Sequence, residues 1–309
     1  MPLIDIVQRW IPEPPPDRLF EITETSLAGA SPRSPGEIRQ QVFLERSLAA
    51  SPSAPNLLKP HLYRGALAQV SGSGAAGRSA APKQSATALV IPDYAVRMAI
   101  LDFEEFPPRE EERNALIRFR LRKSVPFHID EAQVAYSVQV NEPKRIEVLA
   151  IAIARPILTE YETLFTDAGY RVGVVTPSSI AALPLCASPE PGLTIVAKAA
   201  GSTLSVLLLE QGRVRLVRCL DLASGDNEEL ERGDFNILAL LQQTLAYAED
   251  QIGQPATRLL LCGFGPETAA FGRLAQEELR IPCASVHSKF GAASQQNAGL
   301  LGLLEQYAA

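Results

Sequence analysis

The sequence has no excess of basic residues and no long apolar run. It carries 29 Lys and Arg against 35 Asp and Glu, a formal net charge of −6. Because nucleic-acid binding depends on clustered positive charge, this balance argues against a DNA- or RNA-binding function. No segment approaches the roughly 20 apolar residues that a membrane-spanning helix requires, and Asp5 stands where a secretion signal would place positive charge. We therefore expect a soluble, cytoplasmic protein.

Residue types that build metal sites and nucleophilic active sites are also scarce. The sequence has 4 cysteines and 3 histidines. The cysteines lack the paired spacing of metal-binding motifs, so we expect free thiols in apolar surroundings and a reducing compartment. His61, His128 and His287 lie in unrelated segments, and no serine stands in a nucleophile-elbow context. We therefore predict no metal site and no catalytic triad.

The middle of the chain has the clearest secondary-structure pattern. A mixed-charge segment begins with acidic and ends with basic residues, which suits the helix dipole, and Pro126 stops this helix. The apolar run at residues 146–154 predicts a central strand, and Gly169 is typical of a helix end with positive φ. This order predicts a compact α+β unit. The predicted elements are a strand at 94–103, a helix at 109–123, strands at 132–140 and 146–154, a helix at 156–168 and a strand at 170–175.

Two other segments have unusual composition. Residues 1–16 carry apolar side chains at helical spacing, including the only tryptophan, Trp10, and then several prolines. This pattern predicts a short amphipathic helix on a stiff tether, which either folds back onto the body or docks on a partner or membrane surface. Residues 71–85 are rich in Ser, Gly and Ala and cannot bury enough apolar surface to offset their ordering entropy, so we predict a mobile loop there.

Several motifs in the middle of the chain resemble one protein family. They are IPD at residues 91–93, VPF at 125–127, the acidic pair Asp130 and Glu131, and Tyr136 in the next predicted strand. Together they resemble PilM, the actin-like cytoplasmic protein of type IV pilus assembly. Residues 149–183 resemble the continuation of the same family. The resemblance implies an α/β, actin-like (ribonuclease H-like) fold of two lobes with an inserted α+β subdomain.

Sugar kinases share this fold and need an Asp as general base, but no Asp of this sequence stands beside a glycine-rich turn.

The resemblance also implies a division of the chain into domains. The expected parts are an N-terminal segment and tether at 1–16, a first-lobe subdomain at 17–94, the inserted subdomain at 95–175, a connecting helix at 176–191 and a second lobe at 192–309.

The first phosphate loop of the actin-like ATPases corresponds to the turn after residues 18–22. Glu21 stands where the family has Asp, and Thr23 stands where it has Gly. Glycine lets backbone amides approach a phosphate closely, whereas the Cβ of threonine obstructs that approach. Glu21 still offers a carboxylate that can face a hydrated metal ion.

The second phosphate loop corresponds to the predicted hairpin at residues 193–209. Lys198 stands at the acidic position and Ala200 at the glycine position, followed by Gly201 and by Ser202 and Thr203, which match the family. The family carboxylate orders Mg²⁺ or the attacking water, and a lysine does neither. Lys198 can bind a phosphate only as a point charge.

The adenosine of actin-like ATPases lies beside a strand, two glycines and a helix, which correspond here to Gly263 and Gly265 with Phe264 between them. Such a Gly-x-Gly turn is common and weakly specific. We therefore predict a degenerate nucleotide cleft, no bound cofactor and no ATP hydrolysis, with ATP and Mg²⁺ binding only if the cleft still works. The alternative is an active or nucleotide-switched ATPase that uses Glu21 and Ser202 in modified roles.

The function implied by the resemblance is that of a scaffold. PilM proteins hold the cytoplasmic tail of the inner-membrane protein PilN in a groove bordered by the inserted subdomain and link it to the assembly motors. The resemblance therefore implies peripheral association with the inner membrane through partners, and it leaves self-association open. An adaptor of a type II secretion system is the alternative. For the groove we select Arg118, Arg122, Val125 and Phe127, although most of helix 109–123 also suits a merely solvated face.

Overall fold

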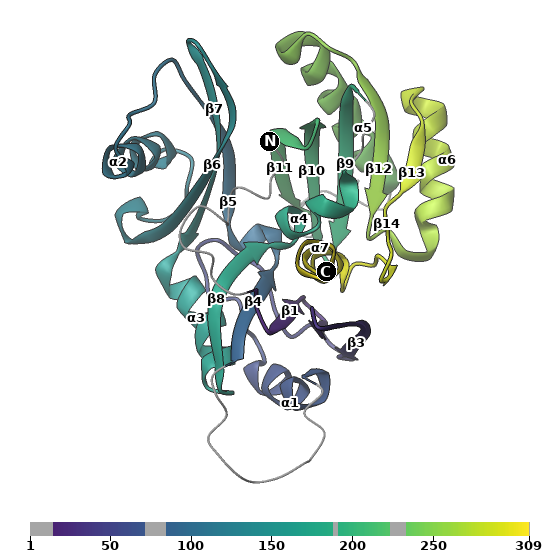
Figure 1. The fold of residues 1–309 in the computed structure, drawn as a ribbon. Helices are drawn as coiled ribbons and strands as arrows, with labels where there is room; N and C mark the ends of the chain where they lie inside the picture. The colour runs from purple at the N-terminus through teal and green to yellow at the C-terminus, as the bar shows by residue number, and fades with distance from the viewer. Residues whose placement is uncertain (1–14, 72–84, 188–190, 223–232, 309) are drawn as a thin grey trace.

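The computed structural model describes residues 15–71, 85–187, 191–222 and 233–308. The predicted N-terminal helix and most of the predicted loop at 71–85 lie outside these ranges. The described chain forms two five-stranded sheets, one three-stranded sheet and a small two-stranded sheet. Figure 1 shows the two large sheets in separate lobes, with the three-stranded sheet beside the second lobe. No helix among the described residues is long and apolar enough to cross a membrane.

The first lobe is a mixed sheet with helices on both faces. Its strands are β1 (Arg18–Ile22), β2 (Ser26–Ser31), β3 (Ser34–Val42), β4 (Ser85–Ile91) and β8 (Tyr170–Pro177), in the order β3-β2-β1-β4-β8. β1, β2 and β3 pair antiparallel, and β4 pairs parallel with β1 and β8. The helices on this sheet are α1 (Pro60–Val70), α3 (Arg155–Thr166), α4 (Ser178–Ala181) and α7 (Ala298–Tyr307).

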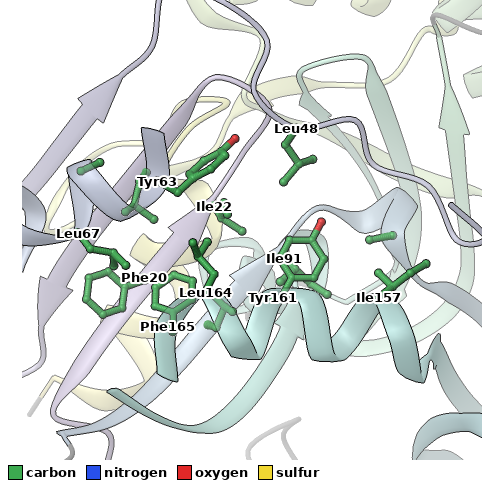
Figure 2. Close-up of a cluster of buried hydrophobic side chains, with 14 of the residues drawn as sticks. Phe20, Ile22, Leu48, Tyr63, Leu67, Ile91, Ile157, Tyr161, Leu164 and Phe165 are labelled. Carbon is green, nitrogen blue, oxygen red and sulfur yellow. The ribbon is translucent and has the colours of Figure 1, made fainter. Parts of the chain in front are cut away.

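The side chains of β1 alternate between the two faces of this sheet, as the pleat requires. Phe20 and Ile22 are fully buried in a core with α1 and α3, shown in Figure 2. Leu19 points to the opposite face, where α7 packs. Glu21 shares that face, and its carboxylate accepts a hydrogen bond from the backbone N–H of Leu300 at 2.8 Å. The Glu21 carboxylate is thus directed at α7.

The second lobe is also built on a mixed five-stranded sheet. Its strands are β9 (Leu193–Ala200), β10 (Thr203–Glu210), β11 (Arg213–Asp221), β12 (Ala256–Cys262) and β13 (Cys283–Ser285), in the order β11-β10-β9-β12-β13. Its helices are α5 (Gly233–Tyr247), which continues as a π-helical turn at Ala248–Ile252, and α6 (Thr268–Leu279). Both helices pack on one face of the sheet. The π-helical turn ends at Gly253, whose φ is 74°.

The inserted subdomain is a three-stranded antiparallel sheet with one helix. Its elements are β5 (Arg97–Phe103), α2 (Glu110–Leu121), β6 (Ala132–Glu142) and β7 (Arg145–Ala154), with β7 central as predicted. Val148 and Ala150 of β7 lie in the core under α2, whereas Leu149 and Ile151 lie in a core shared with the second lobe. The nearly unbroken apolar run of β7 therefore reflects burial on both faces.

The predicted inserted subdomain extended to residue 175, but its sheet ends with β7. β8 pairs in parallel with β4 of the first lobe, from Ser85 and Tyr170 to Ile91 and Pro177. α3 packs its apolar stripe on the first-lobe core. An apolar pattern predicts a strand but not the strand with which it pairs. The sequence analysis therefore grouped α3 and β8 with the inserted subdomain, which precedes them in the chain.

The last helix also differs from its predicted place. The predicted second lobe extended to residue 309, but α7 packs against β1, β2 and α4 of the first lobe. Gly302 makes this possible, because a Cβ there would lie 2.0 Å from the carbonyl oxygen of Ala181. The chain therefore returns to the first lobe at its end.

The remaining short elements are 3-10 turns at Asp93–Ala95, Ile129–Glu131, Leu183–Cys186 and Gly265–Glu267, and the pair β14 (His287–Ser288) and β15 (Gly291–Ala292).

Candidate functional site: the cleft between the lobes

The two hairpins predicted to be phosphate loops are in direct contact. Glu24, in the β1–β2 turn, accepts a hydrogen bond from the hydroxyl of Ser202 in the β9–β10 turn at 2.7 Å. Arg46 donates to the same carboxylate oxygen at 2.9 Å and to Ser202 at 3.3 Å. Gly201 has φ 58°, and a Cβ there would lie 2.7 Å from the Glu24 carboxyl carbon. The hairpin tips therefore bridge the space between the lobes.

Thr23 is engaged within its own turn. Its hydroxyl lies 2.7 Å from the hydroxyl of Ser26, and its carbonyl oxygen accepts a hydrogen bond from Tyr63 at 2.7 Å. Only 9% of the residue is exposed. These contacts fix the β1–β2 turn with its side chain turned inward. On the other hairpin, Thr203 begins β10 opposite Ala200 and is also buried.

Both oxygens of the Glu21 carboxylate have protein partners. Oε1 accepts a hydrogen bond from the hydroxyl of Ser178 at 2.5 Å, and Oε2 accepts one from the backbone of Leu300 at 2.8 Å. Gly299 allows the close approach, since a Cβ there would lie 3.0 Å from Oε1. Burial raises the pKa of Glu21, although Lys198 and Ser178 act in the opposite direction. The carboxylate is thus held by the first turns of α4 and α7.

Lys198 lies within β9, opposite Ser205 of β10 and Cys262 of β12. Its ammonium group is 3.9 Å from Oδ2 of Asp93, and each of the two side chains is 1% exposed. Burial lowers the pKa of Lys198, but the attraction of Asp93 and Glu21 outweighs this effect and the pKa is raised. Lys198 is therefore charged at neutral pH and carries its charge into the first lobe.

Asp93 is the site residue that the sequence analysis did not select. It belongs to the IPD motif directly after β4, and a carboxylate after a buried parallel strand is a recognised signal for a site. Oδ1 accepts a hydrogen bond from the backbone N–H of Ser179 at 2.7 Å, and Oδ2 accepts one from the hydroxyl of Ser205 at 2.7 Å. Asp93 thus contacts both lobes. We call Glu21, Asp93 and Lys198 the interlobe charge cluster.

The two glycines of the predicted adenosine turn have different surroundings. A Cβ on Gly263 would lie 2.2 Å from the carbonyl oxygen of Ala199, so glycine is required where β12 passes β9. Gly265 has φ 64° and open space around its Cα. Phe264 stacks on Phe271 of α6 with ring centroids 4.9 Å apart. The aromatic ring therefore packs on the second-lobe core.

A separate groove lies between the inserted subdomain and the first lobe. Its volume is about 450 Å³, and most of its lining side chains are apolar. Phe127 of the VPF motif lines this groove, together with Arg155 and Pro156 at the start of α3. Glu160 fixes one wall, because its carboxylate accepts hydrogen bonds from the backbone of Asn56 and Leu57 at 2.8 and 2.7 Å. The lining residues are Ser53, Ala54, Pro55, Pro126, Phe127, His128, Glu131, Ala154, Arg155, Pro156, Ile157 and Glu160.

The other three residues selected for a groove have different surroundings. Arg118 donates hydrogen bonds to the carbonyl oxygens of Ile129 and Ala132, the latter at 3.1 Å, and so ties α2 to the start of β6. Val125 packs against the core under α2. Arg122 is exposed and lies 3.4 Å from Asp130. Of the four, Phe127 alone lines the groove described above.

Comparison with solved structures gave matches over almost the whole chain. A chain of a PilM–PilN type IV pilus biogenesis complex aligns with a TM-score of 0.74 and 15% identity, over 96% of this chain and 100% of that chain. A protein of unknown function with an actin-like ATPase fold, from Bacteroides thetaiotaomicron, aligns with a TM-score of 0.53 and 11% identity, over 93% and 94%. The fold is actin-like. The prediction of a two-lobed actin-like α/β fold is therefore confirmed.

The other comparisons gave a weaker structural match or no match. The cytoplasmic domain of EpsL, an inner membrane component of the type II secretion system of Vibrio cholerae, aligns with a TM-score of 0.47 and 10% identity, over 94% of this chain and 93% of that chain. No protein-family model and no curated protein sequence matched.

The residues of this actin-like cleft do not fit a magnesium-bound nucleoside triphosphate. Phosphates in such a site need backbone amides and a carboxylate that is open to a hydrated metal ion. Here both oxygens of Glu21 are bound by protein groups, and Lys198 is buried against Asp93. The hairpin tips that would flank the phosphates hydrogen-bond to each other. The two hairpins predicted to be phosphate loops instead form contacts between the lobes.

Proposed function

We propose that this protein is a cytoplasmic scaffold of a type IV pilus assembly machine, which holds the tail of a PilN-like inner-membrane protein and does not hydrolyse ATP. The observation that carries this proposal is the alignment with the PilM–PilN complex, which extends over 96% of this chain and so includes the inserted subdomain. The motifs of residues 91–93 and 125–127 support the same relationship.

The groove beside Phe127 is the proposed binding site for the tail. Its apolar lining suits the side chains of a peptide, and Arg155 and Glu160 at its walls offer charges that fix the register of a bound chain. β6, which begins at Ala132 beside the groove, is an outer strand of its sheet. An extended tail can therefore fill the groove and form backbone hydrogen bonds along β6.

The interlobe charge cluster supports the non-catalytic part of the proposal. Phosphoryl transfer depends on groups that position the metal ion and the attacking water. Lys198 replaces one such carboxylate, and Glu21 is 1% exposed. We propose that the lobes stay closed on this cluster and that the tail-binding groove needs no nucleotide for its shape.

The tail-binding site is tested with a synthetic peptide of a PilN-like cytoplasmic tail encoded beside this chain, by isothermal titration calorimetry. Phe127→Ala is expected to weaken binding by about tenfold or more, because it removes a central aromatic contact of the groove. Phe119→Ala is the matched control, since Phe119 lies on the outer side of α2 and is 68% exposed. The control is expected to bind like the wild type.

Three results would contradict the proposal. The first is no binding of any PilN-like tail. The second is equal weakening by both substitutions, which would place the tail away from the groove. The third is phosphate release from MgATP by the purified chain, which would support the working ATPase. Binding of a tail from a type II secretion membrane protein, with PilN-like tails inert, would assign the scaffold to that machine instead.

A further inference from the structure

α2 carries an exposed stripe that does not take part in the core of the inserted subdomain. Ile117 and Leu121 are fully buried and define the inner side of the helix. At 100° per residue, the opposite side is centred on Phe119 and includes Ala115. Phe119 is 68% exposed, which is unusual for an aromatic side chain of this size. In Figure 1, α2 lies at the outer edge of the molecule, on the side of its sheet away from the second lobe.

The charges on this stripe are segregated along the helix. Its first turn contains Glu111 and Glu112, and its end is followed by Arg122 and Lys123. All four residues are exposed. The outer stripe therefore has an acidic end, an uncharged middle with Ala115 and Phe119, and a basic end. Segregation alone is explained by the helix dipole, but an exposed phenylalanine between the two charged ends is not.

The stripe is complementary to itself when reversed. If two copies of α2 cross antiparallel about a two-fold axis at position 117, Glu111 and Glu112 at the acidic end of one copy lie beside Arg122 and Lys123 at the basic end of the other. The same axis places Phe119 over Ala115, so that the large side chain meets a small one. Each contact occurs twice, as a two-fold axis requires. A single register thus pairs both charges and the apolar centre.

The basic residues on the flanks of α2 have other roles. Arg113 and Arg120 donate hydrogen bonds to the carbonyl oxygens of Pro107 and Asp102, and Arg118 is bound at the start of β6. The charges of the stripe have only long contacts, 3.4 Å from Arg122 to Asp130 and 3.6 Å from Glu112 to Arg109. Those side chains are half exposed or more and can turn to a new partner.

We propose that α2 is a self-association surface and pairs antiparallel with α2 of a second copy of this chain. The paired helix has 12 residues and is about 18 Å long. Such a contact is smaller than a standard protein interface of about 1,600 Å². The dimer is therefore weak and depends on concentration and salt, as suits copies gathered by a shared assembly. This inference does not rest on the proposed tail binding.

The test is sedimentation equilibrium of the full chain over a range of concentrations at low and high salt. Glu112→Arg and Arg122→Glu are each expected to weaken the dimer by about tenfold or more, because each places like charges opposite one another. An equimolar mixture of the two variants is expected to recover the wild-type affinity as a heterodimer, since each changed residue then faces an opposite charge. The double variant is expected to recover it as a homodimer.

Phe119→Ser is expected to weaken the dimer by about tenfold or more and to leave the melting temperature unchanged. Glu249→Arg, an exposed charge reversal in the second lobe, is the control and is expected to have no effect. A wild-type chain that stays monomeric at every concentration would overturn the proposal. A dimer whose affinity none of these substitutions changes would also overturn it, and so would a mixture no tighter than the single variants.

Discussion

Lys198 reaches from the middle of β9 into the first lobe, where Asp93 and Glu21 provide opposite charge. Moving a charged group out of water costs several kcal/mol, and a buried pair offsets this cost only when its geometry and hydrogen bonds are good. Asp93 has such hydrogen bonds through Ser179 and Ser205, whereas the Lys198 ammonium group lies 3.9 Å away and has no hydrogen-bond partner among the described residues. The Asp93 carboxylate is therefore oriented by hydrogen bonds from both lobes.

Lys198→Met is expected to destabilise the protein by about 3–5 kcal/mol, because it leaves two buried carboxylates without their cation. The measurement is urea denaturation at neutral pH. Lys289→Met is the control, because Lys289 is 59% exposed and pairs with Glu305 at the surface. The control is expected to change stability by about 1 kcal/mol or less. Equal stability of Lys198→Met and the wild type would show that the cluster does not hold the lobes.

Glu21 is expected to make stability depend on pH. Burial raises its pKa above 4.5, so the folded protein holds this proton more tightly than the unfolded chain does. The stability that Glu21 contributes is then greatest below pH 4.5 and falls as pH rises through the raised pKa. Glu21→Gln imitates the neutral carboxyl and is expected to lack this fall. Urea denaturation at several pH values measures it: the stability of the variant relative to the wild type should increase with pH, and a constant difference would contradict the prediction.

At the scale of elements, β7 joins the inserted subdomain to the second lobe. The side chains of β7 alternate between two faces of its sheet: one set packs under α2, and the other set faces β11. Glu147 is among the latter and accepts two hydrogen bonds from Arg215 of β11, at 2.7 and 2.8 Å. Gln139 of β6 adds a third contact by accepting a hydrogen bond from the backbone of Val214. The side chains thus connect two sheets that share no strand pairing.

Arg215→Met is expected to loosen this junction and to cost about 3 kcal/mol, at the lower end for a broken buried pair because Arg145 still binds Glu147. Hydrogen exchange of the amides in β5 and β11 should become faster, whereas amides under α1 should keep their protection. Arg213→Met on the same strand is the control. Unchanged exchange in β5 and β11 would mean that apolar packing alone holds the junction.

At the scale of the whole molecule, several polar contacts span the lobes, among them Lys198 with Asp93 and Ser202 with Glu24, and Arg215 with Glu147 joins the second lobe to the inserted subdomain. The first two involve the hairpin predicted from the sequence to be the second phosphate loop. The lobes of this chain are therefore joined by contacts between its own side chains.

MgATP is expected to change neither the melting temperature nor the radius of gyration measured by small-angle X-ray scattering. A ligand at 1,000 times its Kd stabilises a protein by about 4.1 kcal/mol, which raises the melting temperature of a chain of this size by several degrees. Millimolar MgATP would thus reveal micromolar binding. A rise of several degrees, or a compaction of the chain, would contradict the closed cleft.

The sequence by itself determined much of the fold and part of the site. The apolar run of β7 and the stop at Pro126 are local signals, and the structure bears them out. Lys198 and Thr23 at the positions of an acidic residue and a glycine indicated a degenerate cleft. These signals need no knowledge of distant residues, because helix and strand periodicity depends on the neighbours in the chain.

Only the tertiary structure decided which elements share a sheet and which charges meet. β8 and α3 belong to the first lobe, and α7 returns to it from the end of the chain. Asp93 and Lys198 are separated by more than a hundred residues, and their contact depends on how two sheets are placed in space. Strand and helix patterns state which side of an element is buried, but the identity of the covering element follows from packing of the whole chain.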